Sequence, residues 1–302
     1  MNTKVKICGI EFKNPIMAAS GTFGFGREYS EFYNVGVLGG ICTKGLTLAP
    51  RQGNDGVRVA ETPSGMLNCV GLQNPGVEYF IKNDLPFMKT LGTVIIANAA
   101  GNTLSDYEGI VERLSDSDVD MIELNISCPN VKQGGIAFGV LPQSVEQVTR
   151  AAKNKSKKPL IVKLSPNVSC IADNARAAES GGADAISLIN TLTGMAVDLK
   201  SRRPVLGNIT GGLSGPCVKP VALRMVRDCF GAVSIPIIGL GGIMTAEDAL
   251  EFMLCGARAV QIGTANISDP LASLAVVNSL TTAMKECKIN DINEIVGKLI
   301  TD

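Results

Sequence analysis

The stretch IPIIGLGGIMTAEDAL (residues 235–250) contains one complete unit of the fold that this sequence predicts. It begins with a short run rich in isoleucine, passes through two consecutive glycines and continues in a pattern with helical spacing. Short runs rich in Ile, Val and Leu are typical of parallel strands that are covered on both faces. The stretch therefore indicates a strand, a tight turn and a helix that returns along the sheet.

The same unit recurs along the chain. Helical patterns lie between most of the apolar runs, for example at 144–154, 170–183 and 245–257. Eight strand–helix units predict a single (β/α)₈ barrel domain over residues 1–302, with an open doubly wound sheet as the main alternative. The eight runs are PIMAAS (15–20), GGICTKG (39–45), VIIANAAG (94–101), MIELNIS (121–127), LIVKLS (160–165), AISLINT (185–191), IPIIGLGG (235–242) and AVQIGTA (259–265).

Three segments fall outside this repeat. The opening KVKICGIEFKNP (4–15) predicts a β-hairpin around Cys8 and Gly9, which we expect to cap the N-terminal end of the barrel. Two connections, at 47–76 and 191–220, are too long to be simple turns. Long insertions of this kind are usually lids or binding loops, and we expect them at the C-terminal face of the barrel.

Composition excludes several classes of function. The 302 residues are 45% hydrophobic, and 28 basic residues balance 28 acidic ones, so no basic excess favours nucleic acid or an anionic membrane surface. No apolar stretch predicts a signal peptide or a membrane span. Nine irregularly spaced cysteines without a C-x-x-C pair argue against a disulfide framework, a metal site or an iron–sulfur cluster held by this chain, and favour a cytoplasmic location.

The chain contains no histidine, so proton transfer must use Cys, Lys, Asp, Glu, Tyr or water. Cys128 is the candidate, because it directly follows a strand and precedes a loop containing Gly134 and Gly135. Most cysteines are buried as small apolar side chains, and that interpretation fits Cys42, Cys229 and Cys255.

Polar side chains end the first six predicted strands, where the chemistry of such barrels gathers. Burying each of them would be unfavourable without a partner, so together they indicate a site. Glycines after the last two strands suggest that backbone N–H groups bind a phosphate there. The residues at the eight strand ends are Ser20, Lys44, Asn98, Asn125, Lys163, Asn190, the pair Gly241 and Gly242, and Gly263 with Thr264.

The types of these residues suggest a ligand. Two of them, Lys44 and Lys163, are lysines expected to point inward, where each needs an anion. Such a lysine could also form a Schiff base, or offset negative charge that develops during a reaction. Asn68 and the asparagines at the strand ends suit a flat molecule rich in amides, such as a flavin or a pyrimidine. Glu123 shares a strand face with Asn125 and Ser127, so it could hold a neighbouring amide or lysine deeper in the barrel.

Several motifs together resemble the dihydroorotate dehydrogenase family, specifically the class 1B catalytic subunit, over nearly the whole chain. A cysteine replaces the serine that the membrane-bound class carries in the loop after NIS. The motifs are ASGTFGFG, TKG, ETPSGMLNCVGLQNPG, NISCPNVKQGG, LIVKLSPN, INTLTGMAVD, ITGGLSGP and GLGGI.

The resemblance implies roles for individual residues. Cys128 would be the catalytic base and Lys163 would offset charge on the reduced flavin. Cys69 departs from the small apolar residue that is frequent at its position. FMN would contact Ser20, Lys44, Gly45, Asn98, Asn125, Lys163, Ile189, Gly215, Gly241, Gly242, Gly263 and Thr264. The substrate would contact Lys44, Asn68, Cys69, Val70, Gly71, Leu72, Asn125, Asn190 and Thr191.

The resemblance also implies the reaction and the partner. Dihydroorotate would lose its C5 proton to Cys128 and a hydride from C6 to FMN, giving orotate. A partner subunit with FAD and a 2Fe–2S cluster would pass the electrons to NAD⁺, in a heterotetramer of two catalytic and two partner chains. This agrees with the lack of a G-x-G-x-x-G fingerprint here.

Alternatives remain open. The chain could be a class 1A enzyme that uses fumarate, or a flavin enzyme that acts on uracil-like dihydropyrimidines. It could also be a barrel that binds a phosphorylated ligand without catalysis, although simple binding would not require Cys128 on its glycine-containing loop.

Overall fold

The structure, a computed structural model, describes residues 1–127 and 138–301. Eight parallel strands close into a barrel in the order β10-β15-β16-β3-β4-β7-β8-β9. Each predicted apolar run supplies one strand, so the (β/α)₈ barrel is confirmed and the open doubly wound sheet is wrong. The strands are β3 (Ile16–Ala18), β4 (Gly40–Cys42), β7 (Val94–Ala99), β8 (Met121–Asn125), β9 (Leu160–Lys163), β10 (Ala185–Leu188), β15 (Ile237–Leu240) and β16 (Ala259–Ile262).

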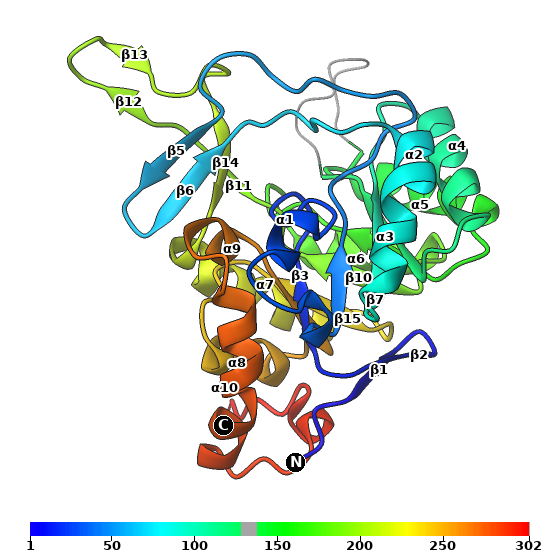
Figure 1. The fold of residues 1–302 in the computed structure, drawn as a ribbon, viewed down its shortest axis with the longest axis vertical. Coiled ribbons are helices and arrows are strands. Elements are labelled where there is room, and N and C mark those ends of the chain that lie inside the picture. The colour runs from blue at the N-terminus through cyan, green and yellow to red at the C-terminus, as the bar shows by residue number, and fades with distance from the viewer. Residues whose placement is uncertain (128–137, 302) are drawn as a thin grey trace.

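Helices surround the barrel (Figure 1). Two of them begin with a capping box, in which the hydroxyl of Thr103 or Thr245 accepts the backbone N–H of an aspartate three residues later. These signals explain the sharp helix starts after β7 and β15. The helices are α1 (Arg27–Ser30), α2 (Val77–Tyr79), α3 (Leu85–Thr90), α4 (Leu104–Ser115), α5 (Pro142–Lys155), α6 (Ile171–Ser180), α7 (Lys219–Phe230), α8 (Ala246–Leu254), α9 (Thr264–Ser268) and α10 (Ala272–Glu286).

The predicted N-terminal hairpin is confirmed. Strands β1 (Val5–Ile7) and β2 (Ile10–Phe12) pair antiparallel, and the turn residues Cys8 and Gly9 have φ angles of 49° and 85°. The Cys8 thiol donates a hydrogen bond to the carbonyl of Asp184, just before β10. Phe12 is fully buried. These contacts place the hairpin at the end of the barrel where the strands begin.

The two long connections form a second sheet rather than irregular loops. Strands β5 (Val59–Thr62) and β6 (Gly65–Asn68) come from the first connection, and β11 (Leu192–Gly194) and β14 (Gly211–Ser214) from the second. The sheet has the order β11-β14-β6-β5. A short hairpin, β12 (Val197–Asp198) with β13 (Arg203–Pro204), extends from it. Figure 1 shows this sheet and the β1–β2 hairpin at opposite ends of the molecule.

Among the residues that the structure describes, two separate groups of buried apolar side chains stabilise these parts. The large core lies between the barrel strands and their helices. A much smaller core, formed by Leu67, Cys69 and Leu206, lies within the second sheet and its connections. The assignment of all 302 residues to one domain stays a prediction.

Candidate functional site

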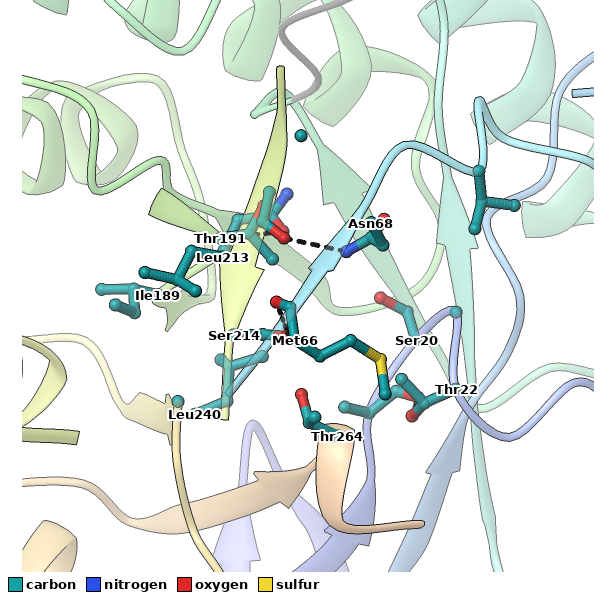
Figure 2. Close-up of a pocket in the computed structure, with 18 of the residues that line it drawn as sticks. Ser20, Thr22, Met66, Asn68, Ile189, Thr191, Leu213, Ser214, Leu240 and Thr264 are labelled. Atoms are coloured by element: carbon teal, nitrogen blue, oxygen red, sulfur yellow. Dashed lines mark hydrogen bonds between the residues drawn. The ribbon is translucent and has the colours of Figure 1, made fainter. Parts of the chain in front are cut away.

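A cavity of about 340 Å³ lies between the C-terminal ends of the barrel strands and the second sheet. This volume is within the usual range for small-molecule sites. In Figure 2 the Met66 side chain extends from β6 toward Ser20 and Thr22, which follow β3, and Thr264 lies nearby. The barrel therefore supplies one wall of the cavity, and the insertions supply the other.

The cavity brings together all but one of the residues predicted for the site. They belong to segments that are far apart in the sequence, and they become neighbours only when the chain folds. Cys128 lies outside the described residues. The predicted residues that line the cavity are Ser20, Lys44, Gly45, Asn68, Cys69, Val70, Gly71, Leu72, Asn98, Asn125, Lys163, Ile189, Asn190, Thr191, Gly215, Gly241, Gly242, Gly263 and Thr264.

Lys163, at the end of β9, points into the barrel and is only 4% exposed. Its Nζ donates a hydrogen bond to the Ser20 hydroxyl at 2.9 Å and lies 3.8 Å from Glu123 Oε1. Glu123 Oε1 also accepts a hydrogen bond of 2.7 Å from the Asn98 amide. The expectation that Glu123 holds a neighbouring amide or lysine is confirmed.

A second set of hydrogen bonds joins β8 to β10 at the edge of the cavity. Asn125 Nδ2 donates to Asn98 Oδ1 at 3.4 Å, and Ser127 Oγ donates to Asn125 Oδ1 at 2.8 Å. The Asn190 amide in turn donates to Ser127 Oγ. The asparagines are thus held in fixed orientations. Ser127 is the last described residue before Cys128.

The glycine-rich wall approaches the cavity through its backbone. Gly215, Gly241 and Gly242 all have positive φ angles, of 101°, 128° and 79°. A Cβ at Gly242 would lie 2.8 Å from the carbonyl oxygen of Gly215 and 2.9 Å from the backbone N of Lys219, so no side chain fits. This wall presents main chain rather than side chains, as a phosphate site requires.

Gly263 differs from those glycines. A Cβ there would lie 3.5 Å from Ala19 Cβ, which is ordinary contact. Its neighbour Thr264 begins α9 and lines the same cavity. The start of α8, in contrast, is already capped by Thr245 and Asp248. The two glycine-containing turns therefore differ. The backbone at Gly241 and Gly242 is tightly packed, whereas the backbone at Gly263 has space beside it.

The substrate loop predicted at residues 68–72 is part of the second sheet and its exit. The Asn68 amide donates a 3.3 Å hydrogen bond to the Gly212 carbonyl, which holds β6 against β14 (Figure 2). Cys69 is 4% exposed, and its thiol donates to the Val57 carbonyl at 3.5 Å. This contact gives Cys69 a structural role in the small core.

Some lining residues were missed by sequence reasoning. Met66, Leu213 and Ser214 reach the cavity only because two distant insertions pair as a sheet. Gln261 was also missed, although a polar residue within the apolar run AVQIG was a signal. Its Nε2 donates to Glu123, whereas its buried Oε1 has no hydrogen-bond partner in the part of the chain that the structure describes.

The three cysteines expected to be structural are buried. Burial raises the pKa of the Cys42 thiol well above its ordinary value, and the neighbouring Glu123 carboxylate raises it further. Burial likewise raises the pKa of Cys229 to about 12 and that of Cys255 above its ordinary value. None of these thiols is suited to act as a thiolate base near neutral pH.

The fold and the cavity together define a (β/α)₈-barrel protein with a cavity at the strand ends whose lining includes lysine, asparagine and glycine residues. A family model described as "Dihydroorotate dehydrogenase" matches residues 2–284. The chain belongs to the dihydroorotate dehydrogenase family.

Similar proteins cover essentially the full chain. A protein of Alkaliphilus oremlandii (strain OhILAs), named "Dihydroorotate dehydrogenase B (NAD(+)), catalytic subunit", is 57% identical over 298 residues, with 99% of each chain covered. Proteins of the same name are 53% identical over 298 residues in Geotalea uraniireducens (strain Rf4), with 98% of each chain covered, and 51% identical over 302 residues in Thermoanaerobacter pseudethanolicus (strain ATCC 33223 / 39E), with 100% covered. Within the described residues, no helix is both long and apolar enough to cross a membrane.

Proposed function

We propose that this chain oxidises dihydroorotate to orotate with bound FMN, as the catalytic subunit of an NAD⁺-linked enzyme. The observation that carries the proposal is the cavity itself. It joins two buried or half-buried lysines, a fixed set of asparagines and a glycine backbone wall. The names of the similar proteins agree with this activity.

FMN fits the residues that are present. The wall formed by Gly215, Gly241 and Gly242 would hold a phosphate through backbone N–H groups. Gln261 Oε1, which has no hydrogen-bond partner among the described residues, is an acceptor for a ligand N–H, and Lys163 supplies a cation in the same cavity. When bound, FMN supplies the acceptor for the hydride from C6 of dihydroorotate.

The protein's own residues would perform the remaining tasks. The Cys128 thiolate takes the proton from C5, a role that no histidine can fill in this chain. The ammonium of Lys163, fixed by Ser20 and Glu123, stabilises negative charge at the bottom of the cavity. Asn68, Asn125 and Asn190 orient the carboxylate and amide groups of the substrate. The second sheet covers the cavity and limits the access of water.

Electrons must then leave the chain. The similar proteins are named catalytic subunits of NAD(+) enzymes, which supports a partner subunit for this chain. We infer that this partner carries FAD and a 2Fe–2S cluster and assembles with it as a heterotetramer in the cytoplasm. The chain itself has no dinucleotide fingerprint that would bind NAD⁺.

The test uses the purified chain loaded with FMN. Under anaerobic conditions dihydroorotate should bleach the flavin, whereas dihydrouracil, which lacks the carboxylate, should not. The chain alone should then reduce artificial dyes but not NAD⁺, and NAD⁺ reduction should require the partner. Efficient NAD⁺ reduction by the single chain would contradict the partner assignment. Strong fumarate reduction would instead indicate the class 1A reaction, and a colourless protein would indicate a non-catalytic binder.

A further inference from the structure

Glu123 lies at the centre of the barrel floor, beneath the cavity, and is completely buried. Its carboxylate has hydrogen-bond or ionic contacts with side chains from five other strands. Oε1 accepts from Asn98 Nδ2 at 2.7 Å and from the Cys42 thiol at 3.2 Å. Oε2 accepts from Ser187 Oγ at 2.8 Å and from Gln261 Nε2 at 3.0 Å. One carboxylate thus connects β4, β7, β10 and β16 to its own strand β8, in addition to its ion pair with Lys163 on β9.

The carboxylate is held in its charged form. Burial raises the pKa of Glu123. The charge of Lys163 lowers this pKa, and so do the hydrogen bonds from Cys42, Ser187 and Gln261. The second effect is larger, so the pKa lies below its ordinary value. A buried carboxylate without such partners would take up a proton. Glu123 and Lys163 therefore form a nearly neutral pair at the floor of the cavity, with only the lysine lining it.

The same carboxylate fixes the direction of two amides. A carboxylate accepts hydrogen bonds, so the NH₂ groups of Asn98 and Gln261 must face it. Their oxygens must then face elsewhere. Asn98 Oδ1 accepts from Asn125 Nδ2 at 3.4 Å. Gln261 Oε1 remains buried without a partner among the described residues, on a side chain that lines the cavity.

We infer that Glu123 is a positioning residue that sets the charge and the hydrogen-bond polarity of the cavity floor through Lys163, Asn98 and Gln261, and so tunes the reduction potential of the flavin. The inference rests on the proposed function in so far as FMN occupies the cavity. Glu123 keeps Gln261 as an acceptor for a ring N–H. It also offsets part of the positive potential that Lys163 exerts on the ring, because a lone cation would favour the anionic reduced form more strongly.

The experiment measures the midpoint potential of bound FMN in a two-by-two set of variants: wild type, Glu123→Gln, Lys163→Met and the double variant. Glu123→Gln should raise the potential, because it removes an anion near a retained cation. Lys163→Met should lower it. In the Lys163→Met background, Glu123 has lost its cationic partner, and we expect the buried carboxyl group to take up a proton, so adding Glu123→Gln should change the potential little.

A second readout is the FMN dissociation constant, measured by flavin fluorescence. Glu123→Gln should weaken binding roughly tenfold, because one of the two amides can no longer keep its orientation. Glu123→Asp retains the negative charge, but its side chain is too short to keep all of the hydrogen bonds. It should keep a potential near that of the wild type and still bind FMN more weakly.

The outcomes are distinct. A purely structural Glu123 would give equal shifts in both lysine backgrounds, or no shift in potential, and either result overturns the inference while the proposed function stands. If Glu123→Gln does not fold, as judged by circular dichroism, Glu123→Asp decides: wild-type FMN affinity in that variant overturns the inference. A wild-type protein that binds no FMN overturns both proposals.

Discussion

At the scale of single residues, the proposed chemistry depends on the Cys128 thiol as the base. Ser127 is hydrogen-bonded to Asn125 and Asn190 at the cavity edge, and Cys128 is the next residue in the sequence. Among the described residues, the thiols of Cys42 and Cys69 have surroundings that do not favour a base. Cys42 is buried beside the Glu123 carboxylate with a raised pKa, and Cys69 donates its thiol hydrogen to a carbonyl. Neither thiol is therefore a better candidate for the base than Cys128, whose role stays a proposal.

Replacing Cys128 tests this assignment. Positioned general bases contribute about 10²- to 10⁴-fold, so Cys128→Ala should slow anaerobic flavin reduction by dihydroorotate by that factor while FMN stays bound. Cys128→Ser should also be slow at neutral pH and recover partly at high pH, because a hydroxyl loses its proton far less readily than a thiol. Stopped-flow bleaching of the flavin measures the rate.

Cys69→Ala is the matched control, because Cys69 is the one cavity-lining thiol among the described residues. It should leave the rate of flavin reduction close to that of the wild type. A large defect in Cys69→Ala together with a near-normal rate in Cys128→Ala would show that the base has been assigned to the wrong thiol.

At the scale of elements, the second sheet covers the site and has only a small buried core of its own. Its own core consists of Leu67, Cys69 and Leu206, with a few half-buried neighbours, separate from the large barrel core. Elements with few buried apolar contacts open at lower free energy than the rest of a protein. A substitution that disorders this sheet should therefore weaken substrate binding more than it lowers the stability of the barrel.

Leu67→Ala is expected to loosen the sheet without unfolding the barrel. If the substitution lowers the free energy that favours the ordered sheet by about 1.4 kcal/mol, the KM for dihydroorotate should rise about tenfold. Amide hydrogen exchange should become faster in β6 and in its neighbours β5 and β14, which pair with it. Steady-state kinetics and exchange measured by mass spectrometry would test both effects.

Leu114→Ala provides the comparison. Leu114 is fully buried on α4, in the barrel core and outside the cavity lining. Deleting such a side chain typically costs about 2–5 kcal/mol, so this variant should unfold at lower denaturant concentration and keep its KM. The prediction for the second sheet is wrong if Leu67→Ala lowers global stability as much as Leu114→Ala and leaves KM unchanged.

At the scale of the whole molecule, one buried carboxylate joins six of the eight barrel strands. The net pKa of Glu123 lies below its ordinary value of 4.5. A group whose pKa is depressed in the folded state contributes stability above its unfolded pKa, and this contribution is lost as the pH falls through the folded pKa. Part of the acid sensitivity of the barrel should therefore arise from this residue.

Chemical denaturation of the wild type and of Glu123→Gln at several pH values would measure this contribution. The difference in the free energy of unfolding should be constant above about pH 4.5 and should shrink at more acidic pH, because the carboxylate then becomes protonated. Glu112→Gln is the control, because it breaks a half-exposed ion pair between α4 and Lys155 of α5, and it should show little dependence on pH. A difference for Glu123→Gln that stays constant down to acidic pH would contradict the depressed pKa.

Much of this protein could be predicted from its sequence because the signals are local. Eight apolar runs of similar length, separated by helical patterns, allow few folds other than a closed barrel. Polar residues such as Lys163 and Asn98 at the ends of those runs indicated the cavity, since the ends of parallel strands meet at one face. The hairpin around Cys8 and Gly9 followed from its turn residues.

The remaining features depended on contacts between distant segments. Two long connections predicted as loops pair as one sheet, because β6 and β14 hydrogen-bond across almost 150 residues of chain. The link from Gln261 to Glu123 likewise depends on the closure of the barrel. The sequence by itself therefore determined the repeating strand–helix units and the residues at their ends, which depend on local periodicity. Only the tertiary structure decided which side chains share a carboxylate and which insertions cover the site, because those hydrogen bonds and packing contacts exist only when remote strands meet.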